Sequence, residues 1–254
     1  MFGKLVLFSL ILCFALPVAF AAEATPATPQ LTAEEVIAKN VAARGGLGGW
    51  RAVHSMIMSG RMEVGKGMAV PFTLELKRPR KMRLEIVFRE QTAVQVYDGT
   101  KGWKLRPFLG RKEVEPFSPD ELQAASAQVE LDGPLVDYAA KGFKAELVGR
   151  ESLDGHDAYK LKLTKQAKPN EQEVVSHIWL DANTLLELKA DAGRRIRGRE
   201  RRVTTQYRDY KWVGGLLIPH VVETSVEGAP ESHKIVVESV VLNPKLKDAR
   251  FTTP

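Results

Sequence analysis

The amino-acid sequence predicts a mainly β protein of the α+β class, built on a single curled antiparallel sheet of about 11 strands with an N-terminal helix and further short helices. From Ser55 onward, apolar and polar residues alternate with a period of two, which is typical of strands with one dry and one wet face. Asp-Gly and Gly-Gly pairs separate these segments, as at Asp98-Gly99 and Gly214-Gly215. So many antiparallel strands in one sheet must curl or close, and helices inserted among them would cover the concave face.

The first 21 residues predict a cleaved signal peptide. Lys4 is the only charge before Glu23, and an apolar run from Leu5 to Phe20 ends at Ala19-Phe20-Ala21. A positive start, a short apolar core and small residues at the cleavage site are typical of such a peptide. The run is shorter than the roughly 20 residues of a spanning helix, and Pro17 interrupts it. We therefore expect cleavage near Ala21 and a periplasmic protein.

The cysteine content limits the chemistry of the exported chain. Cys13 is the only cysteine and lies inside the apolar core of the signal peptide. Ile11 and Leu12 precede it, where a lipoprotein signal requires small residues, so a lipid anchor is not expected. Once Cys13 is removed, disulfides, thiolate catalysis and cysteine metal sites are excluded.

The remaining chain reads as a leader and one domain. Residues 22–31 are rich in Ala, Thr and Pro and predict a flexible leader. Thr32 and Glu35 have the capping-box spacing of a helix start, and the glycine pairs at 45–46 and 48–49 predict its end. Residues 32–254 contain no linker and no repeat, which indicates a single domain.

Helix signals interrupt the strand pattern near the middle of the chain. Ser118-Pro119 predicts a helix with Ser118 as the cap and Pro119 at the first position. A second short helix is expected over 135–141, ending at Gly142. The expected strands lie at 55–61, 72–77, 82–89 and 94–96, and then at 144–150, 158–165, 174–180, 185–190, 202–213, 217–226 and 234–242.

The sequence contains no recognisable catalytic or metal-binding motif. No two of the five histidines have the spacing of metal ligands on one element, and no G-x-S-x-G elbow precedes a helix. The glycine-rich segment 45–49 follows a helix instead of a strand and lacks the Lys-Ser/Thr of a P-loop. We therefore predict no catalytic residue, no metal, no cofactor, and a binding protein instead of an enzyme.

A cluster of arginines accounts for much of the net charge of +6. Six arginines and one opposing glutamate lie within residues 194–202. Two interpretations stay open: a solvated loop beside strands, or a segment attracted to anionic lipid head groups. The candidate membrane-surface residues are Arg194, Arg195, Arg197 and Arg199. Export argues against a nucleic-acid partner.

The segment 76–110 has a specific order of motifs. Lys77-Arg78-Pro79 ends one strand, a strand of alternating basic and apolar residues follows, and Asp98-Gly99 precedes Trp103 and Pro107-Phe108. The chain closes with Asp248-Ala249-Arg250-Phe251-Thr252. This order resembles the LolA/LolB-like family of periplasmic lipoprotein carriers, in particular its subgroup of outer-membrane lipoprotein-sorting proteins.

The resemblance implies an incomplete β-barrel with helices as a lid over an apolar cavity. It also implies that the cavity shields the acyl chains of a lipid or lipoprotein during transport toward the outer membrane. Burial of an acyl chain gains about 0.8 kcal/mol per CH₂, so such binding needs few polar contacts. The implied partners are a lipid or acylated lipoprotein and transport components of the inner or outer membrane, with the chain itself acting as a monomer.

The candidate site residues follow from the strand phase and the resemblance. The resemblance implies that Arg78 occupies the place of the arginine that helps to hold the lid in the carrier family. The alternative, that Arg78 is an ordinary residue at the end of a strand before the turn set by Pro79, stays open. Trp103 reads either as a cavity residue or as core. The candidates for the apolar cavity are Phe72, Leu74, Leu76, Leu84, Ile86, Val94, Val96, Trp103, Ile178 and Leu180.

Two other classes of function stay open. The same fold occurs in envelope sensors that detect mislocalised lipids or lipoproteins, although the second domain usual in such regulators is not found in the sequence. An enzyme would need a cluster of polar groups that converge in the cavity. A deep apolar cavity would favour the carrier or the sensor, and a polar cleft would favour the enzyme.

Overall fold

The computed structural model describes residues 31–63, 67–165, 173–196, 198–230 and 232–254. The chain divides into two units, residues 1–30 and Leu31–Pro254, and only the second is described. The expected signal peptide and the leader as far as Gln30 lie outside the described residues. Leu31 already packs against the hydrophobic core.

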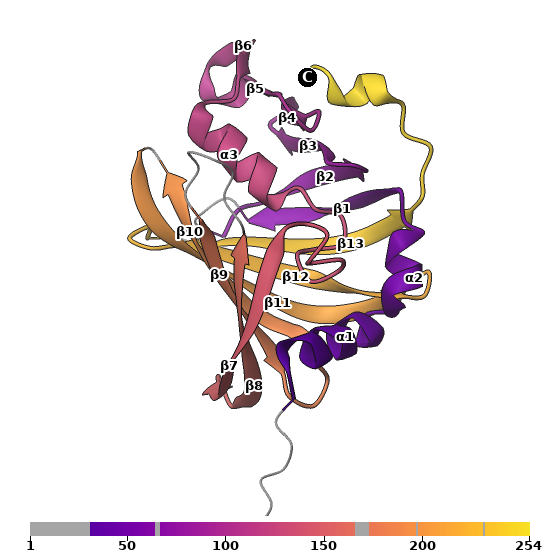
Figure 1. Cartoon of the computed structure of the whole chain (residues 1–254). Helices are drawn as coiled ribbons and strands as arrows, with labels where there is room; N and C mark the ends of the chain where they lie inside the picture. The colour runs from indigo at the N-terminus through magenta and orange to yellow at the C-terminus, as the bar shows by residue number, and fades with distance from the viewer. Residues whose placement is uncertain (1–30, 64–66, 166–172, 197, 231) are drawn as a thin grey trace, which may run out of the picture. The chain divides into compact units, whose positions relative to one another are not determined.

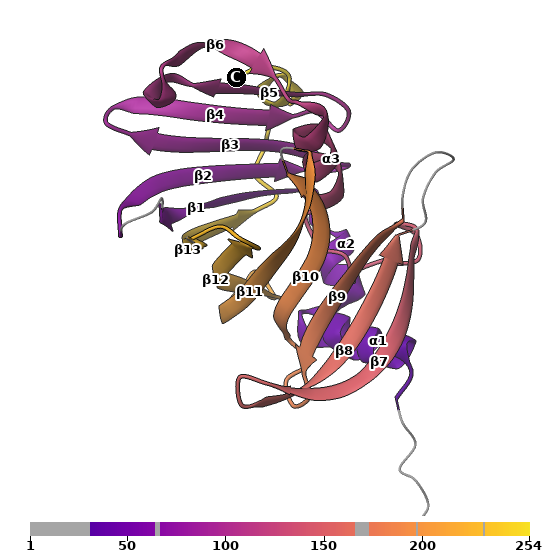
Figure 2. The same cartoon turned by 90° about the vertical axis from the view of Figure 1, so that its left-hand side faces the viewer.

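One open antiparallel sheet of 13 strands dominates the second unit. The strands neighbour one another in the order β6-β5-β4-β3-β2-β1-β13-β12-β11-β10-β9-β8-β7, so β6 and β7 are free edges. Figures 1 and 2 show the sheet curling around the helices, with the strands before α3 in one half and the later strands in the other. The bounds are β1 Ser55–Glu63, β2 Ala69–Lys77, β3 Lys81–Phe88, β4 Gln91–Tyr97, β5 Gly102–Arg106, β6 Arg111–Pro116, β7 Phe143–Leu153, β8 His156–Lys165, β9 Val174–Asp181, β10 Glu187–Ile196, β11 Arg199–Val213, β12 Leu216–Val226 and β13 His233–Leu242.

The predicted fold class is confirmed, with two more strands than expected. The additional strands are β5 and β6, which precede α3 and pair with each other at the edge of the sheet. They escape the period-two pattern because β5 has only five residues and β6 reads RKEVEP, with one apolar side chain between charges. Short, charged edge strands are a common way to prevent further strand pairing.

Within the described part of the chain, three α-helices accompany the sheet. They are α1 Ala33–Ala43, α2 Gly46–Arg51 and α3 Pro119–Gln128, and capping boxes at Thr32 and Ser118 start α1 and α3 as predicted. The glycine pairs were predicted to end the first helix. The structure shows that a second short helix, α2, begins among them at Gly46. Gly45 at the junction has φ +106°, and a Cβ there would lie 2.3 Å from the carbonyl oxygen of Gly215. Only glycine allows this close approach of the helix junction to β12.

The helix expected over 135–141 was wrong. These residues form consecutive turns instead, and Asp137 has φ +52°, which a right-handed helix does not accommodate. We call residues 129–142 the lid segment. Figure 1 shows it beside α1 and α2 on the inner side of the curled sheet.

Within the described residues, no helix has the length and apolar character to cross a membrane.

The main core lies between the concave face of the sheet and the helices. Trp50, Val36 and Ile37 of the helices pack there with Met56, Leu161 and other strand residues. The convex face is covered differently, by the C-terminal 3₁₀ turn η2 Asp248–Phe251. The buried core residues include Val41, Val53, Leu76, Tyr97, Phe117, Leu163, Ile178, Leu180, Leu216 and Ile218.

Candidate functional site

The lid segment fills the inner side of the curl. Leu135 and Val136 are 1% and 0% exposed, and both belong to the same core cluster as α1 and the concave face. Val129 is buried in this cluster as well, while Leu131 and Tyr138 pack against it. The lid segment is therefore held on its inner side by apolar contacts with the concave face and the helices.

Asp132 attaches the lid segment to the sheet through a buried carboxylate. Its side chain is 1% exposed and accepts hydrogen bonds from Arg78 Nη2 at 2.7 Å and from Lys141 Nζ at 2.5 Å. Arg78 follows β2 and also donates to the carbonyl oxygens of Val53 and Trp50, at 2.8 and 3.1 Å. One guanidinium thus joins the end of a strand, the end of α2 and the lid segment.

A second polar cluster lies beneath α1. Arg44 and Glu187 form a buried ion pair of 2.8 Å, and Arg44 Nη1 also donates to the carbonyl oxygen of Asp132 at 3.4 Å. The hydroxyl of Tyr210 donates to the Glu187 carboxylate at 3.1 Å. Burial, together with the charge of Glu187, raises the pKa of Tyr210. The phenol is therefore a permanent donor at neutral pH, and the cluster links α1, β10, β11 and the lid segment.

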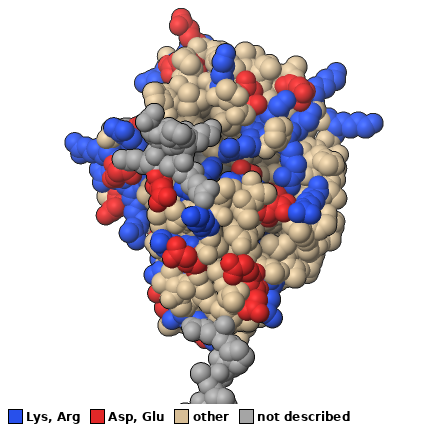
Figure 3. All heavy atoms as spheres, in the orientation of Figure 1, with Lys and Arg blue, Asp and Glu red and all other residues tan. Residues whose placement is uncertain are grey.

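The outer edge of the lid segment carries an ion pair to α2. Arg51 donates to both oxygens of Asp137, at 2.5 and 3.0 Å, and the hydrogen bonds from Arg51 hold the pKa of the Asp137 carboxyl below its usual range. Figure 3 shows Lys and Arg side chains gathered in the upper right of the face, around the positions of α2 and the C-terminal segment in Figure 1.

Seven of the ten cavity candidates lie on the concave face. In antiparallel strands, residues directly opposite each other project to the same face. Phe72 pairs with Ile86, Leu74 with Leu84 and Leu76 with Met82, and Leu76 is a member of the inner core. Ile178 and Leu180 belong to the same core. Leu84 and Ile86 are only half-buried, so the concave face continues as apolar surface beyond the core.

The placement of Val94, Val96 and Trp103 on this face was wrong. Leu84 pairs with Gln95, so Val94 and Val96 project to the convex face, and Trp103, opposite Val96, does too. Val94 and Val96 are buried because η2 covers this part of the convex face with Phe251, which is fully buried. Strand β4 is buried on both faces, so an alternation of apolar and polar residues cannot show which of its side chains face the concave side.

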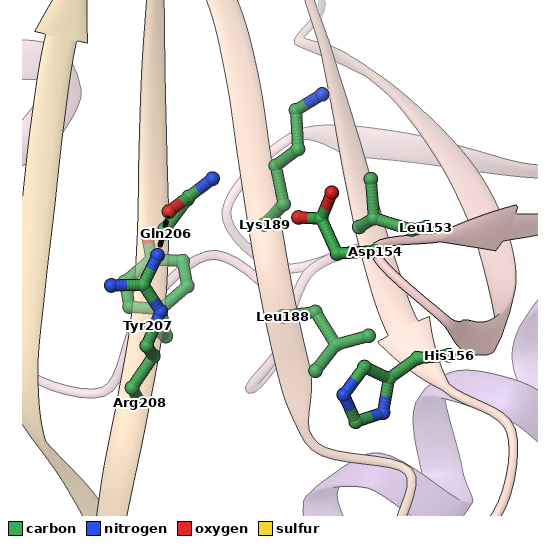
Figure 4. Close-up of a pocket in the computed structure, with 8 residues that line it drawn as sticks. All are labelled: Leu153, Asp154, His156, Leu188, Lys189, Gln206, Tyr207 and Arg208. Carbon is green, nitrogen blue, oxygen red and sulfur yellow. Dashed lines mark hydrogen bonds between the residues drawn. The ribbon is translucent and has the colours of Figure 1, made fainter.

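On the inner side of the curl, the helices, the lid segment and the concave face pack into one hydrophobic core. A pocket of about 130 Å³ lies at the β7–β8 turn beside β10 and β11 (Figure 4). Its lining includes Asp154, His156 and Lys189, a polar set that does not suit an acyl chain. A larger pocket of about 320 Å³ near His177 is also lined mainly by charged groups. Binding of an acyl chain would therefore require the lid segment to move.

The arginine cluster is a β-hairpin, and its side chains divide between both faces. Arg194 lies two residues beyond Ala192 in the concave phase of β10 and is half-buried, whereas Arg195 points to the opposite face and is exposed. Arg199 is exposed near the tip, and Arg197 lies outside the described residues. The described candidates for a membrane surface therefore lie on different faces, and their attraction to lipid head groups stays a prediction.

Sequence reasoning missed the residues that bind the lid segment. Asp132 precedes Gly133, and such a pair predicts only a turn. Arg44 and Glu187 carried no signal, because 143 residues separate them. Among the described residues, no group of three or more His, Cys, Asp or Glu side chains could hold a metal ion.

No family model and no curated protein matches the sequence. Solved structures do match the fold. A LolA superfamily protein from Nitrosomonas europaea aligns at 17% identity with a TM-score of 0.58, over 88% of this chain and 99% of that chain. A domain described as an outer membrane lipoprotein-sorting protein, from Vibrio parahaemolyticus, aligns at 14% identity with a TM-score of 0.55, over 87% and 96%.

A DUF1329 family protein from Desulfovibrio piger aligns at 18% identity with a TM-score of 0.55, over 86% of this chain and 96% of that chain. At these identities the likeness concerns the backbone arrangement. The open curled sheet, the helices on its inner side and these three alignments lead to one conclusion: residues 31–254 have the LolA-like fold.

Proposed function

We propose that this chain is exported to the periplasm and binds the acyl chains of a lipid or lipoprotein on its concave face. It shields them from water during transport toward the outer membrane. The fold supports this proposal, because two structures that share it are described as a LolA superfamily protein and a lipoprotein-sorting domain. The proposal treats the chain as a carrier that acts as a monomer and meets membrane transport components at each end of its path.

The observation that carries the proposal is the way the lid segment covers the concave face. Its apolar side chains Leu135 and Val136 occupy the core, and it has three ion pairs to the rest of the domain: Asp132 with Arg78, Glu130 with Arg80 and Asp137 with Arg51. A segment held by so few polar links can leave as a unit when they are released. While the segment is in place, its apolar side chains occupy the position that an acyl chain would take.

Magnitudes allow such an exchange. Burying Leu135, Val136 and Val129 gains roughly 1.5–3 kcal/mol for each side chain, and Leu131 and Tyr138 add partly buried contacts. An acyl chain with about a dozen methylenes gains roughly 10 kcal/mol on full burial. The two amounts are of the same order, so weakening the polar links of the lid segment shifts the exchange toward the ligand.

The half-buried residues of β3 indicate where binding begins. Leu84 and Ile86 share the concave face with the core residue Leu76 but lie outside the core cluster. They form apolar surface that is already accessible while the lid segment is in place. We assign them, with Phe72 and Leu74, to the first contact with an acyl chain, and Arg78 to the control of the lid segment.

The test is mass spectrometry of the organic extract of protein purified from its native envelope. The proposal predicts co-purifying lipid or acylated protein, reduced in the variant Leu84→Asp. Absence of any acylated molecule from the folded wild-type protein would contradict it. A carrier must also release its ligand to acceptor vesicles, whereas an envelope sensor would retain it, so a transfer assay separates these two functions.

A further inference from the structure

Arg194 projects into the concave side of the sheet. On β10, Ala190 pairs with the core residue Ile178 and packs against the core, so residues two and four positions further on project to the same face. Arg194 is in this phase and is half-buried. Burial lowers the pKa of its guanidinium, while the neighbouring Tyr207 acts in the opposite direction.

The guanidinium of Arg194 has no counter-ion among the described residues. Other arginines of the same hairpin are partnered: Arg202 with Asp191 at 3.2 Å and Arg201 with the carbonyl oxygen of Glu227 at 3.1 Å. No described residue forms a hydrogen bond or an ion pair with Arg194. A partly desolvated charge without a partner is costly, which distinguishes this residue from the solvated arginines at the hairpin tip.

Tyr207 of β11 faces the same space. Tyr207 lines the pocket of Figure 4 together with Gln206 and Arg208, and the figure shows its ring on the other side of the strand from their side chains. No described residue accepts a hydrogen bond from its hydroxyl, whereas the nearby Tyr210 donates to Glu187. Burial raises the pKa of Tyr207 to about 12, so its hydroxyl is protonated and able to donate at neutral pH.

Small side chains lie between these two polar groups. Ala190 pairs with Thr205 and Ala192 with Val203, all in the concave phase. Ser176, opposite Ala192 on β9, has the same phase. Val203 in this stretch is buried, and the side chains of Arg194 and Tyr207 project toward it from its two ends.

We propose that Arg194 and Tyr207 bind the oxyanion headgroup of an amphiphile, a carboxylate or a phosphate, while its acyl chain lies on the apolar part of the concave face. The proposal rests on the proposed function and deepens it by assigning the charge of the ligand. A guanidinium offers several donors in a fixed plane, which suits both oxyanions. A bound anion supplies the partner that the protein itself does not provide.

The experiment compares ligands with the same chain and different headgroups. Binding of laurate, dodecyl phosphate, dodecanol and inorganic phosphate to the purified full-length mature protein is measured by calorimetry. The wild type is expected to bind the two anionic amphiphiles about tenfold or more tightly than dodecanol. Inorganic phosphate alone is expected to bind far more weakly than dodecyl phosphate, because it lacks the acyl chain.

Two variants and a control assign the effect to the site. Arg194→Gln and Tyr207→Phe are expected to weaken the anionic amphiphiles, by about tenfold for Arg194→Gln, and to leave dodecanol unchanged. Arg208→Gln serves as the matched control, because Arg208 is exposed on the opposite face of β11 beside Tyr207, and it is expected to leave all ligands unchanged. Thermal melting of Arg194→Gln is expected to match the wild type, since no internal contact is lost.

The possible failures are distinguishable. If the wild type binds laurate and dodecanol equally, or if Arg194→Gln has no effect, the headgroup site is refuted and the acyl-binding function stands. If inorganic phosphate binds as tightly as dodecyl phosphate, the site is an anion site without an acyl chain, and the inference is overturned. If none of the amphiphiles binds, the proposed function fails and the inference fails with it.

Discussion

The guanidinium of Arg78 and the carboxylate of Asp132, 54 residues apart in the chain, lie 2.7 Å apart and form the polar link between β2 and the lid segment. Asp132 is the more buried partner, at 1% exposed, and also holds Lys141. Two cations on one buried carboxylate make Asp132 the residue whose loss affects the lid segment most.

We predict that Asp132→Asn loosens the lid segment. The amide cannot neutralise Arg78 and Lys141, so the free energy of unfolding falls by about 2–3 kcal/mol, below the range for a fully buried pair because Arg78 is 29% exposed. Hydrogen exchange at residues 129–142 becomes faster, and the affinity for an amphiphile rises. Chemical denaturation, exchange mass spectrometry and calorimetry measure these effects.

A matched control for this variant is Asp154→Asn. Asp154 also precedes a glycine but is exposed, in the β7–β8 turn. It is expected to leave stability, exchange at residues 129–142 and affinity unchanged. Equal behaviour of the two variants would mean that Asp132 acts only as a turn residue.

A second prediction separates the two faces of β3. Leu84→Asp places a carboxylate on the concave face, where desolvation of the charge opposes an acyl chain, and is expected to weaken amphiphile binding by about tenfold or more. Val87 lies on the same strand but on the convex face, where it is 40% exposed. The variant Val87→Asp is therefore expected to bind amphiphiles like the wild type. Equal loss in both variants, measured by calorimetry on folded protein, would refute the assignment of the concave face.

The C-terminal turn is expected to serve stability and not binding. Phe251 is fully buried on the convex face, and Arg250 beside it bonds both oxygens of Glu75, at 2.6 and 2.7 Å. Phe251→Ala is predicted to lower the free energy of unfolding by about 3 kcal/mol, because it exposes apolar surface and leaves a void. Amphiphile affinity should not change in the folded protein. Loss of affinity without loss of stability would contradict this division between the faces.

The ion pair at the rim of the lid segment makes a prediction about pH. Because Arg51 lowers the pKa of Asp137, the contribution of this pair is present above the ordinary carboxyl pKa of 3.8 and is lost as the pH falls below it. Carboxyl NMR titration is expected to show a depressed pKa for Asp137 in the wild type and a value close to the ordinary one in Arg51→Gln. An unchanged pKa in the variant would exclude the pair as the cause.

The sequence allowed most of the fold to be predicted, because period two and turn residues are local signals. The capping-box spacing of Thr32 and Glu35 and the pair Ser118-Pro119 located the starts of α1 and α3 for the same reason. Strands β5 and β6 were missed because their residues are few and charged. The helix expected near Asp137 failed because apolar spacing says nothing about a left-handed backbone.

The candidate site was harder to predict, because it depends on which face a second layer covers. The alternation in β2 and β3 predicted the face of Leu76 and Leu84. Strand β4 is buried on both sides, so only its register with β3 assigns Val96 to the convex face. The contact of Arg78 with Asp132 joins distant parts of the chain and leaves no periodic trace. Arg194 and Arg195 are adjacent in sequence and differ only in the face on which the sheet places them.

The central claim is that the lid segment must leave the concave face before an acyl chain can bind. The sequence offers a direct test, because its only cysteine, Cys13, lies in the expected signal peptide. In the double variant Arg51→Cys and Asp137→Cys, a short reducible crosslinker between the two thiols would tie the lid segment to α2. We predict that the crosslinked protein loses amphiphile binding and that reduction restores it. Equal affinity of the crosslinked and reduced forms would contradict the account.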